Sequence, residues 1–400
     1  MASIAPLREE IERVFPERPF SIVFWDGSTL AATGDDGGPT FTVRSRRALG
    51  HALRAPGQLG LGRAYVSGEI AVDDIDAVID LLNSWDPPSI ETRQKLRLLA
   101  IAARAHGPGL PPKPPAAELR LTGKRHTKAR DAKAVRYHYN VSNEFFALFL
   151  DDSMTYSCGF FSRDGSSLEA AQRAKLKLTA DKLELQPGER LLDVGCGWGS
   201  FAIHAAADHG VDVVGVTLSE PQAVRARERV AEAGLSERVE IRVSDYRDLA
   251  GERFDAIASI GMVEHVGEER IDLYAERLRG LLGDGGRLLN HGITRLRHTD
   301  PEAGPFTERY VFPDGEPLHL SRVLLALERA GFVTRHVEEF GADYAETLRH
   351  WARRLDENLE EAVRLAGEER VRVWRLYLRA AGRGFESGFT SIYQVLCRTA

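Results

Sequence analysis

The chain has 400 residues, and its 53 lysines and arginines against 59 aspartates and glutamates give a formal net charge of −6. This length favours two domains, and the acidic balance gives no overall support for nucleic-acid binding. The three cysteines are widely separated and too few for a disulfide framework. No apolar run is long enough to span a bilayer, and the first residues lack a secretory leader. Composition therefore predicts a protein of the reducing cytoplasm, soluble or peripheral to a membrane.

Residues 1–85 predict a small α+β domain. A helix over LREEIERVF precedes strand-like stretches around turns at 26–27 and 35–38. A later helix carries apolar residues at Ile75, Val78, Ile79 and Leu82. Residues 86–130 are rich in proline and then in basic residues, which predicts a linker. Residues 131–400 then form the second predicted domain.

A glycine-rich turn marks the start of an α/β pattern in this second domain. In LLDVGCGWGS an apolar strand runs through Asp193 into Gly195, Gly197 and Gly199, and the following FAIHAAADHG predicts a helix. The next strands end near Thr217 and near Asp245. Because ligands bind at the carboxyl ends of parallel strands, these positions predict a cofactor crevice. The pattern resembles the class I S-adenosylmethionine-dependent methyltransferases, a Rossmann-like fold; the alternative is a Rossmann-like turn kept only for packing.

After about residue 293 the alternation of predicted strands and helices no longer holds. The apolar residues from Leu348 to Leu359 and the run VRVWRLYLRAAGRGF predict two amphipathic helices, interpreted as core packing. A last strand, TSIYQVLCR, is expected to pair with the sheet.

Four further segments place chemically unusual residues where the same sheet edge is expected: YSCGFF, GMVEHVG, HGI and FGADY. Glu264 and His265 follow one strand and His291 follows another, which is where catalytic groups of such folds lie. A metal site is not expected, since no ligand spacing supports one. His265 is interpreted as structural, and Cys158 could be a small buried hydrophobe instead of a site residue.

In order along the chain, these motifs make the protein similar to the cyclopropane-fatty-acyl-phospholipid synthase family, related to the mycolic acid cyclopropane synthases. The motifs include YHYNVSNEFFALFLDDSMTYSCGFF, LDVGCGWG, GVTLSEPQ, DYRDL, GMVEHVG, NHGI and ERYVFPDGEP. The resemblance implies transfer of a methylene group from S-adenosylmethionine to the double bond of an unsaturated acyl chain in a membrane phospholipid. It also implies that a carbocation on the chain is deprotonated by bound bicarbonate.

The resemblance assigns site residues by motif. Bicarbonate is expected to be held by Cys158, His291, the backbone N–H of Ile293 and Tyr344, with Glu264 accepting from it and His291 helping to keep Glu264 charged. The expected cofactor residues are Tyr156 and Ser157 at the methionine end, Asp193, Gly195 and Gly197 at the glycine turn, Thr217, Leu218 and Gln222 near the ribose, and Asp245 and Tyr246 at the adenine. Some family members carry a cysteine in the late helix where this chain has Ala381, which favours bicarbonate as the base.

Two other functions stay open at this point. One is a fatty-acyl C-methyltransferase that leaves a methyl or methylene branch, and the other is a lipid-binding protein with an inactive methyltransferase domain. The expected partners are unsaturated phospholipid and the inner face of the cell membrane, with no nucleic acid and with a second copy in a homodimer. The first domain is expected to handle lipid or to make the dimer contact. The basic run KRHTKARDAKAVR is either a solvated helix face or attracted to anionic headgroups, and the phenylalanines at 145, 146, 149, 160 and 161 form core or line an acyl groove.

Overall fold

The protein has a mixed α/β fold, seen in a computed structural model that describes residues 3–34, 37–139, 141–161, 167–249, 251–297 and 304–400. The chain divides into two compact units. The smaller unit is Met1–Leu119 with Gly304–Val311 and Gly367–Ala380, and the larger is Arg120–Ala303 with Phe312–Ala366 and Ala381–Ala400. The predicted Rossmann-like class I methyltransferase fold is confirmed in the larger unit, and a smaller α+β unit contains the N-terminus.

The smaller unit has a four-stranded sheet in the order β2-β1-β3-β4. Gly27 adopts φ +83 in the turn between β1 and β2, at the predicted Asp26-Gly27 position. The Asp74 side chain caps α4 by accepting from the backbone of Asp76 and Ala77. Leu82 of the predicted apolar stripe is 70% exposed, and Leu81 is buried in its place. The elements are α1 (Ala5–Val14), β1 (Ser21–Val23), β2 (Thr29–Leu30), β3 (Thr40–Val43), α2 (Arg47–Arg54), α3 (Gln58–Val66), β4 (Ile70–Val72) and α4 (Ile75–Ser84).

The segment expected to be a linker, 86–130, contains a helix, α5 (Thr92–His106). Glu91 and Gln94 form a capping box at its start, and its alanines Ala102 and Ala105 are buried in the core of the smaller unit. Farther along, the Glu118 carboxylate accepts two hydrogen bonds from Arg63, at 2.6 and 2.7 Å, with both side chains nearly fully buried. Capping and a buried ion pair thus order residues whose composition suggested only a spacer.

Two segments from the second half of the sequence belong to the smaller unit, which the predicted boundary at 131 did not foresee. The first contains α13 (Pro305–Tyr310) and places the Phe306 ring against Gly62, where an added Cβ would lie 2.4 Å from the ring. The second is the start of α17 (Glu368–Glu386), where Arg372 lies against Gly68. These close contacts explain why the segments cluster with the smaller unit.

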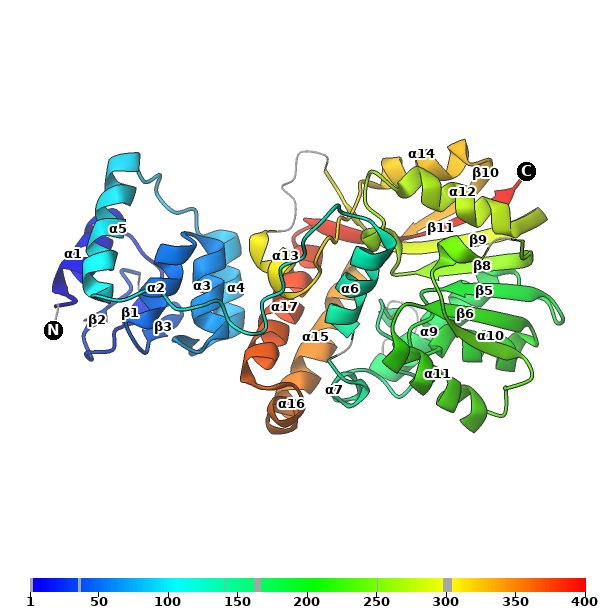
Figure 1. Ribbon diagram of the computed structural model, residues 1–400, viewed down its shortest axis with the longest axis horizontal. Helices are drawn as coiled ribbons and strands as arrows, with labels where there is room; N and C mark the ends of the chain where they lie inside the picture. The colour runs from blue at the N-terminus through cyan, green and yellow to red at the C-terminus, as the bar shows by residue number, and fades with distance from the viewer. Residues whose placement is uncertain (1–2, 35–36, 140, 162–166, 250, 298–303) are drawn as a thin grey trace. The chain divides into compact units, whose positions relative to one another are not determined.

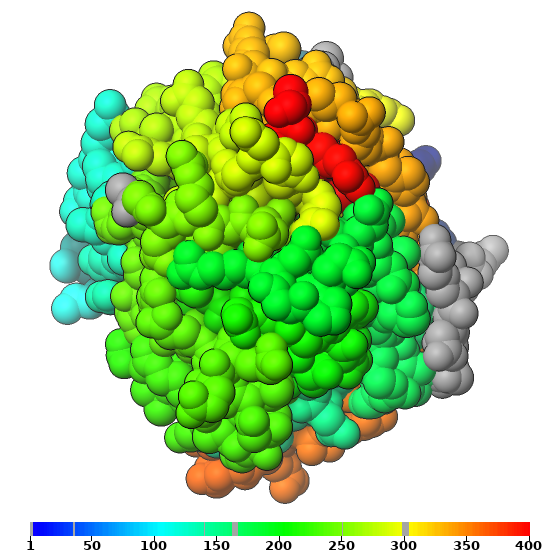
Figure 2. Space-filling view, turned by 90° about the vertical axis from the view of Figure 1, so that its right-hand side faces the viewer, coloured from blue at the N-terminus to red at the C-terminus, as the bar shows by residue number. Residues whose placement is uncertain are grey.

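The larger unit is built on a seven-stranded sheet in the order β10-β11-β9-β8-β5-β6-β7. The five strands from β9 to β7 run parallel, and β11 pairs antiparallel with both β9 and β10. The last strand therefore joins the sheet, as predicted, and Figure 2 shows its red end at the surface beside the orange part of the chain. The strands are β5 (Arg190–Val194), β6 (Asp212–Thr217), β7 (Val239–Val243), β8 (Phe254–Ile260), β9 (Leu282–Arg295), β10 (Phe332–Glu339) and β11 (Thr390–Thr399).

Helices cover both faces of this sheet (Figure 1). In β5, Leu191 packs among residues of α9, α10 and α11, whereas Leu192 and Val194 pack among residues of α12 and α14. This alternation is the two-residue period of a strand buried on both sides. The covering helices are α9 (Leu168–Leu183), α10 (Ser200–His209), α11 (Glu220–Glu232), α12 (Ile271–Leu281) and α14 (Leu320–Arg329).

The remaining elements of the larger unit are helical. Three helices replace the two predicted after residue 340, because Leu359 begins a separate helix and Gly367 adopts φ +77 between the last two. The elements are α6 (Lys128–Tyr139), α7 (Asn143–Ala147), the short helices η1 (Tyr246–Asp248) and η2 (Val263–His265), α15 (Gly341–Glu357) and α16 (Leu359–Ala366). Over the described ranges, none of the helices combines the length and apolarity needed to cross a bilayer.

Candidate active site

The glycine turn follows β5 directly. Gly195, Gly197 and Gly199 have φ values of +77, +55 and +79, which favour glycine. An added Cβ on Gly195 would lie 2.6 Å from the Met262 sulfur. The Val216 carbonyl accepts from the backbone N–H groups of Gly195 and Cys196, which fixes the turn against β6. The sequence thus folds here into a tight loop that opens onto the start of α10.

One cavity lies at the carboxyl ends of β5, β6 and β7. All ten residues expected to contact the cofactor line it: Tyr156, Ser157, Asp193, Gly195, Gly197, Thr217, Leu218, Gln222, Asp245 and Tyr246. The Thr217 hydroxyl donates to Gln222 Oε1 at 3.0 Å, so two of the expected ribose contacts also hold one another. The structure brings these residues together around one space, and their contacts to the cofactor stay a prediction.

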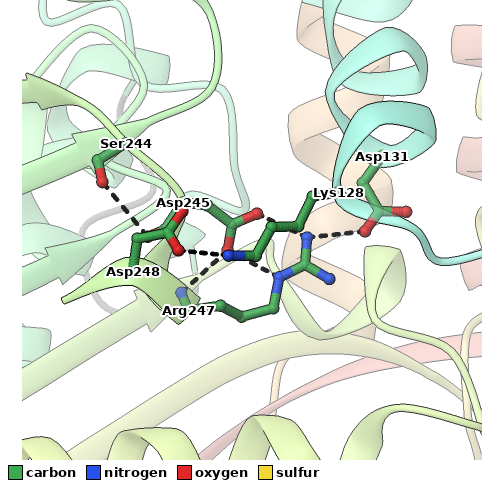
Figure 3. A network of polar contacts seen from close by, with 6 residues as sticks. All are labelled: Lys128, Asp131, Ser244, Asp245, Arg247 and Asp248. Atoms are coloured by element: carbon green, nitrogen blue, oxygen red, sulfur yellow. Dashed lines mark hydrogen bonds and ion pairs between the residues drawn. The ribbon is translucent and has the colours of Figure 1, made fainter. Parts of the chain in front are cut away.

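At one end of the cavity an arginine holds two acids (Figure 3). Arg247 donates to both carboxylate oxygens of Asp245, at 2.8 and 2.6 Å, and to Asp131 of α6 at 2.9 Å. Burial opposes ionisation of Asp245, but the hydrogen bonds from Arg247 outweigh it and lower the pKa of that carboxyl. Lys128 of α6 pairs with Asp248 beside this group. The expected adenine end is therefore rigid and charge-compensated.

The same cavity is also lined by a buried lysine that the sequence analysis did not single out. Lys175 of α9 is 1% exposed, and its ammonium donates to Ser157 Oγ at 2.9 Å. Asp193 is 2% exposed, and its Oδ2 atom has no hydrogen-bond partner among the described residues. Burial raises the pKa of Asp193 to about 7 and lowers that of Lys175 to about 8.

Glu264 lies in η2, between residues that line the cavity. Its Oε1 accepts from the backbone N–H of Ile293 at 2.9 Å, while Oε2 is buried without a partner in the described chain. Burial raises the pKa of Glu264 to about 7 despite that hydrogen bond. In this structure the Ile293 N–H is used by Glu264, and the prediction that it binds bicarbonate stays a prediction.

His291 does not keep Glu264 charged, contrary to the prediction. His291 is fully buried, and burial together with the charges of Lys175 and Lys182 lowers its pKa well below the usual value. The ring is therefore neutral, and neither of its nitrogens has a partner among the described residues. The partial charge that Glu264 carries near neutral pH comes from its own hydrogen bond and not from an imidazolium.

Phe340 connects the other predicted segments. Its ring stacks on Phe160 with centroids 4.0 Å apart and lies 6.1 Å from the His291 ring. Its carbonyl accepts from the backbone N–H of Tyr344 at 3.0 Å and from the Cys158 thiol at 3.7 Å. Cys158 is fully buried, and burial raises its pKa, so it is a neutral thiol donating to backbone carbonyls. The segments carrying Cys158, His291 and Tyr344 thus meet, as their order along the sequence led us to expect.

None of the residues predicted to hold bicarbonate is among those lining the cavity, although Ser157 next to Cys158 and His265 next to Glu264 do line it. The phenylalanines at 145, 146, 149, 160 and 161 do not line it either: the first four are completely buried core, and Phe161 stacks on His350. Part of the basic run is internally paired, since Arg130 donates to both oxygens of Asp314. Among the described residues no cluster of three histidine, cysteine or acidic side chains suits a metal ion.

Sequence reasoning missed Arg247 and Lys175. Arg247 follows the predicted Asp245 by two residues, and nothing in DYRDL says that the arginine turns back onto the aspartate. Lys175 carried a readable signal: it lies in register with Leu168, Ala171, Leu176 and Leu183 on the buried stripe of α9. A lysine on the apolar face of a predicted helix indicates either that the helix is wrongly assigned or that the charge is buried for a functional reason.

Comparison with known proteins agrees with this geometry. Residues 126–395 match the family model described as mycolic acid cyclopropane synthetase. A probable fatty acid methyltransferase from Mycobacterium tuberculosis is 40% identical over 97% of this chain and 92% of its own length. Cyclopropane-fatty-acyl-phospholipid synthase from Escherichia coli is 38% identical over 70% of this chain and 72% of its own length.

A solved structure shares the larger unit's fold. Mycolic acid cyclopropane synthase CmaA1 complexed with SAH and CTAB is 34% identical, with a TM-score of 0.64, and covers 67% of this chain and 98% of its own. The family match spans more than half of the chain and includes every predicted site residue. The chain therefore belongs to the mycolic acid cyclopropane synthetase family and is an enzyme of the S-adenosylmethionine-dependent methyltransferase class.

Proposed function

We propose that the enzyme transfers a methylene group from S-adenosylmethionine to the cis double bond of an unsaturated acyl chain in a membrane phospholipid, forming a cyclopropane ring. The observation that carries this proposal is a set of buried polar atoms that have no partner among the described residues: Glu264 Oε2 and both ring nitrogens of His291. Burying unpaired polar atoms costs free energy. A site for a proton-accepting group explains why they are retained.

The chemistry requires such a group. S-adenosylmethionine supplies an electrophilic methyl group when bound. An alkene is a weak nucleophile, so most of the rate must come from holding it in line with that methyl. The alkene carbon forms a bond to the methyl carbon as the carbon–sulfur bond breaks, and a cation remains on the acyl chain. Loss of one proton from the new methyl then closes the ring.

His291 and Glu264 fit a bicarbonate ion in part. A neutral His291 has one ring N–H to donate, and Glu264 Oε2 can accept from the hydroxyl of the ion. Bicarbonate would supply the base for the proton lost in ring closure. In this structure Ile293 donates to Glu264 and Cys158 donates to backbone carbonyls, and their contacts to the ion stay a prediction.

Fatty-acyl C-methylation is the second candidate. The relative that matches 97% of the chain is named a probable fatty acid methyltransferase, whereas the phospholipid synthase matches 70%. In that reaction the same cation undergoes a hydride shift and then loses a proton from the new methyl group, which leaves a methylene branch on an open chain. The alternative of a lipid-binding protein with an inactive domain has less support, because the cavity retains its glycine turn and its buried acids.

Product analysis tests the proposal. The full-length protein is incubated with S-adenosylmethionine and vesicles of a monounsaturated phospholipid, with and without added bicarbonate, and the lipid is examined by proton NMR. Upfield cyclopropane protons are expected, with more product when bicarbonate is present. A branched chain without those protons would replace the first candidate by the second, and cofactor turnover without any lipid product would contradict both.

The same proposal includes the setting of the reaction. Because the substrate is a bilayer lipid, we infer that the enzyme acts at the inner face of the cell membrane as a peripheral protein. We also infer that it forms a homodimer. Co-sedimentation with anionic vesicles, weakened by salt, supports the first inference, since headgroup attraction is screened. Sedimentation velocity of the purified chain tests the second. The smaller unit is proposed to handle lipid or to form the dimer contact.

A further inference from the structure

Lys175 is the most deeply buried charged group in the wall of the cofactor cavity. Its side chain is 1% exposed, and within the part of the chain that the structure describes its ammonium makes one hydrogen bond, to Ser157 Oγ at 2.9 Å. Burying an ammonium group is costly unless a negative charge compensates it. Its neighbours on the helix stripe are apolar or neutral, so packing alone does not explain a lysine at this position.

Ser157 is fixed from two directions by α9. Gln172 Nε2 donates to its carbonyl at 2.8 Å, and Lys175 donates to its hydroxyl oxygen. Because that oxygen accepts from the ammonium, the Ser157 hydroxyl proton is directed elsewhere. Lys175 and Ser157 therefore present several donors and a positive charge to one part of the cavity, which is the arrangement that recognises a carboxylate.

Two buried acids favour the charged form of Lys175: Asp151, which lies outside the lining of the cavity, and Asp193, which lines it. The buried Oδ2 atom of Asp193 has no partner among the described residues, and no direct ion pair joins it to Lys175 there. The two still influence one another, since each charge favours ionisation of the other group. A buried cation and a buried anion that share a cavity without touching suit a ligand that carries both charges.

We propose that Lys175, together with Ser157, binds the carboxylate at the amino-acid end of S-adenosylmethionine, while Asp193 faces its ammonium group. The carboxylate is the only anionic group of that molecule. This inference rests on the family's use of the cofactor and not on which lipid product is formed. Lys175 thereby becomes a cofactor-binding residue that orients the methionine end, opposite the Asp245–Arg247 group that we expect at the adenine end.

A comparison of two ligands tests the assignment. S-adenosylhomocysteine carries the amino-acid end, and 5′-methylthioadenosine lacks it. In the full-length Lys175→Met variant, calorimetry is expected to show the affinity for S-adenosylhomocysteine lowered about 10- to 100-fold, as for loss of a hydrogen bond to a charged group. The affinity for 5′-methylthioadenosine is expected to stay within about twofold, because no lost contact involves it.

Lys177→Met is the matched control. Lys177 is an exposed lysine on the same helix, paired with Asp181, and its removal is expected to leave both affinities unchanged. Ser157→Ala is expected to weaken S-adenosylhomocysteine less than Lys175→Met does, and the double variant is expected to lose less than the sum because the two residues act on one group. Equal weakening of both ligands by Lys175→Met, or no weakening of either, would overturn the proposal.

The unmodified protein supplies a second test if Lys175→Met does not fold. The carboxamide of S-adenosylhomocysteine keeps the size of the ligand and removes its negative charge. We expect it to bind the wild-type chain at least about tenfold more weakly than the acid. Equal affinity for the acid and the carboxamide would show that the cavity does not recognise the carboxylate. A failure of the lipid reaction, by contrast, would leave these affinities as expected.

Discussion

Two regions near the cavity differ in whether their charged and polar atoms have hydrogen-bond partners. At the end formed by η1 and α6, both oxygens of Asp245 accept from Arg247, which also reaches Asp131. Outside the lining of the cavity, Glu264 Oε2 and both nitrogens of His291 are buried with no partner among the described residues. The first region is electrostatically complete by itself, and the second is not.

The difference corresponds to two roles. We call the group of Asp245, Arg247 and Asp131 the holding region, and Glu264 with His291 the reacting region. A carboxylate matched by an arginine is preorganised and keeps a low pKa, which suits a fixed end of the cavity that needs no change during turnover. A carboxyl whose pKa lies at about 7 can gain or lose a proton near neutral pH, which suits proton transfer. Unsatisfied polar atoms are tolerated where function requires them and are costly elsewhere.

Glu264→Gln is expected to have the largest effect. The amide keeps the shape of the side chain and an oxygen for the Ile293 N–H, but it removes the ionisable group. Turnover of cofactor on monounsaturated phospholipid vesicles should fall about 10²- to 10⁴-fold, as for loss of a group that assists proton transfer. Affinity for S-adenosylhomocysteine should stay unchanged, because Glu264 does not line the cavity.

Glu268→Gln is its control. This glutamate is four residues farther along and 53% exposed in its ion pair with Arg322, so the same chemical change should leave turnover unaltered. Turnover by Glu264→Gln within about tenfold of the wild type would remove Glu264 from the proton-transfer role.

Arg247→Met is expected to have the next largest effect, on stability. It leaves the buried carboxylate of Asp245 and the partly buried carboxylate of Asp131 without their cation, and breaking such a group costs about 3 kcal/mol. The free energy of unfolding in urea should fall by that amount, and binding of S-adenosylhomocysteine should weaken with it. Arg322→Met is the matched control: its partners Glu268 and Asp272 are about half exposed, so it should cost less than about 1 kcal/mol. Equal losses in the two variants would show that burial of the Asp245 group contributes nothing.

Much of the cavity that contains the holding region could be predicted from the sequence. Glycines spaced by one residue after an apolar strand, and acids or hydroxyls at successive strand ends, fix where a parallel sheet opens, because strand direction and right-handed crossovers leave few alternatives. Asp193, Thr217 and Asp245 were placed at one edge on this reasoning, and the structure puts them in one cavity. Local pattern is enough where the backbone alone determines position.

The interactions among those residues could not be predicted in the same way. Whether the N–H of Ile293 points to a ligand or to Glu264, and whether His291 is charged, depends on how β9 and η2 pack and on how deeply they lie. The helix in residues 92–106 was missed because proline-rich flanks dominated the composition of that segment. Burial and pairing are properties of the folded chain and have no local signature in the sequence.

The pH dependence of stability gives a third prediction, on the reacting region. The pKa of Glu264 is about 7 in the folded chain, against 4.5 as its ordinary value. Between these values the folded protein holds a proton that the unfolded chain has released, so this group makes stability fall as the pH rises from 4.5 to 7. The full difference is about 3 kcal/mol, which Glu264→Gln should remove.

Urea unfolding of both proteins at several pH values measures this change. The variant should gain stability relative to the wild type as the pH rises, and the difference should level off above pH 7. The raised pKa of Asp193 is present in both proteins and cancels. A stability difference that stays constant across the range would mean that Glu264 ionises normally in the folded chain.

The smallest effect is expected at the outer edge of the holding region. Lys128 pairs with Asp248 beside the Asp245–Arg247 group (Figure 3), and both of these side chains are about half exposed to solvent. Solvent screening limits such a pair to about 0.2–1 kcal/mol. Lys128→Ala should therefore lower the free energy of unfolding by that amount at most, with the loss shrinking as salt is added, and should leave affinity for S-adenosylhomocysteine within about twofold. A loss as large as that of Arg247→Met, insensitive to salt, would mean that α6 is held to the cavity by its exposed charges and that burial does not divide this region into a strong inner and a weak outer part.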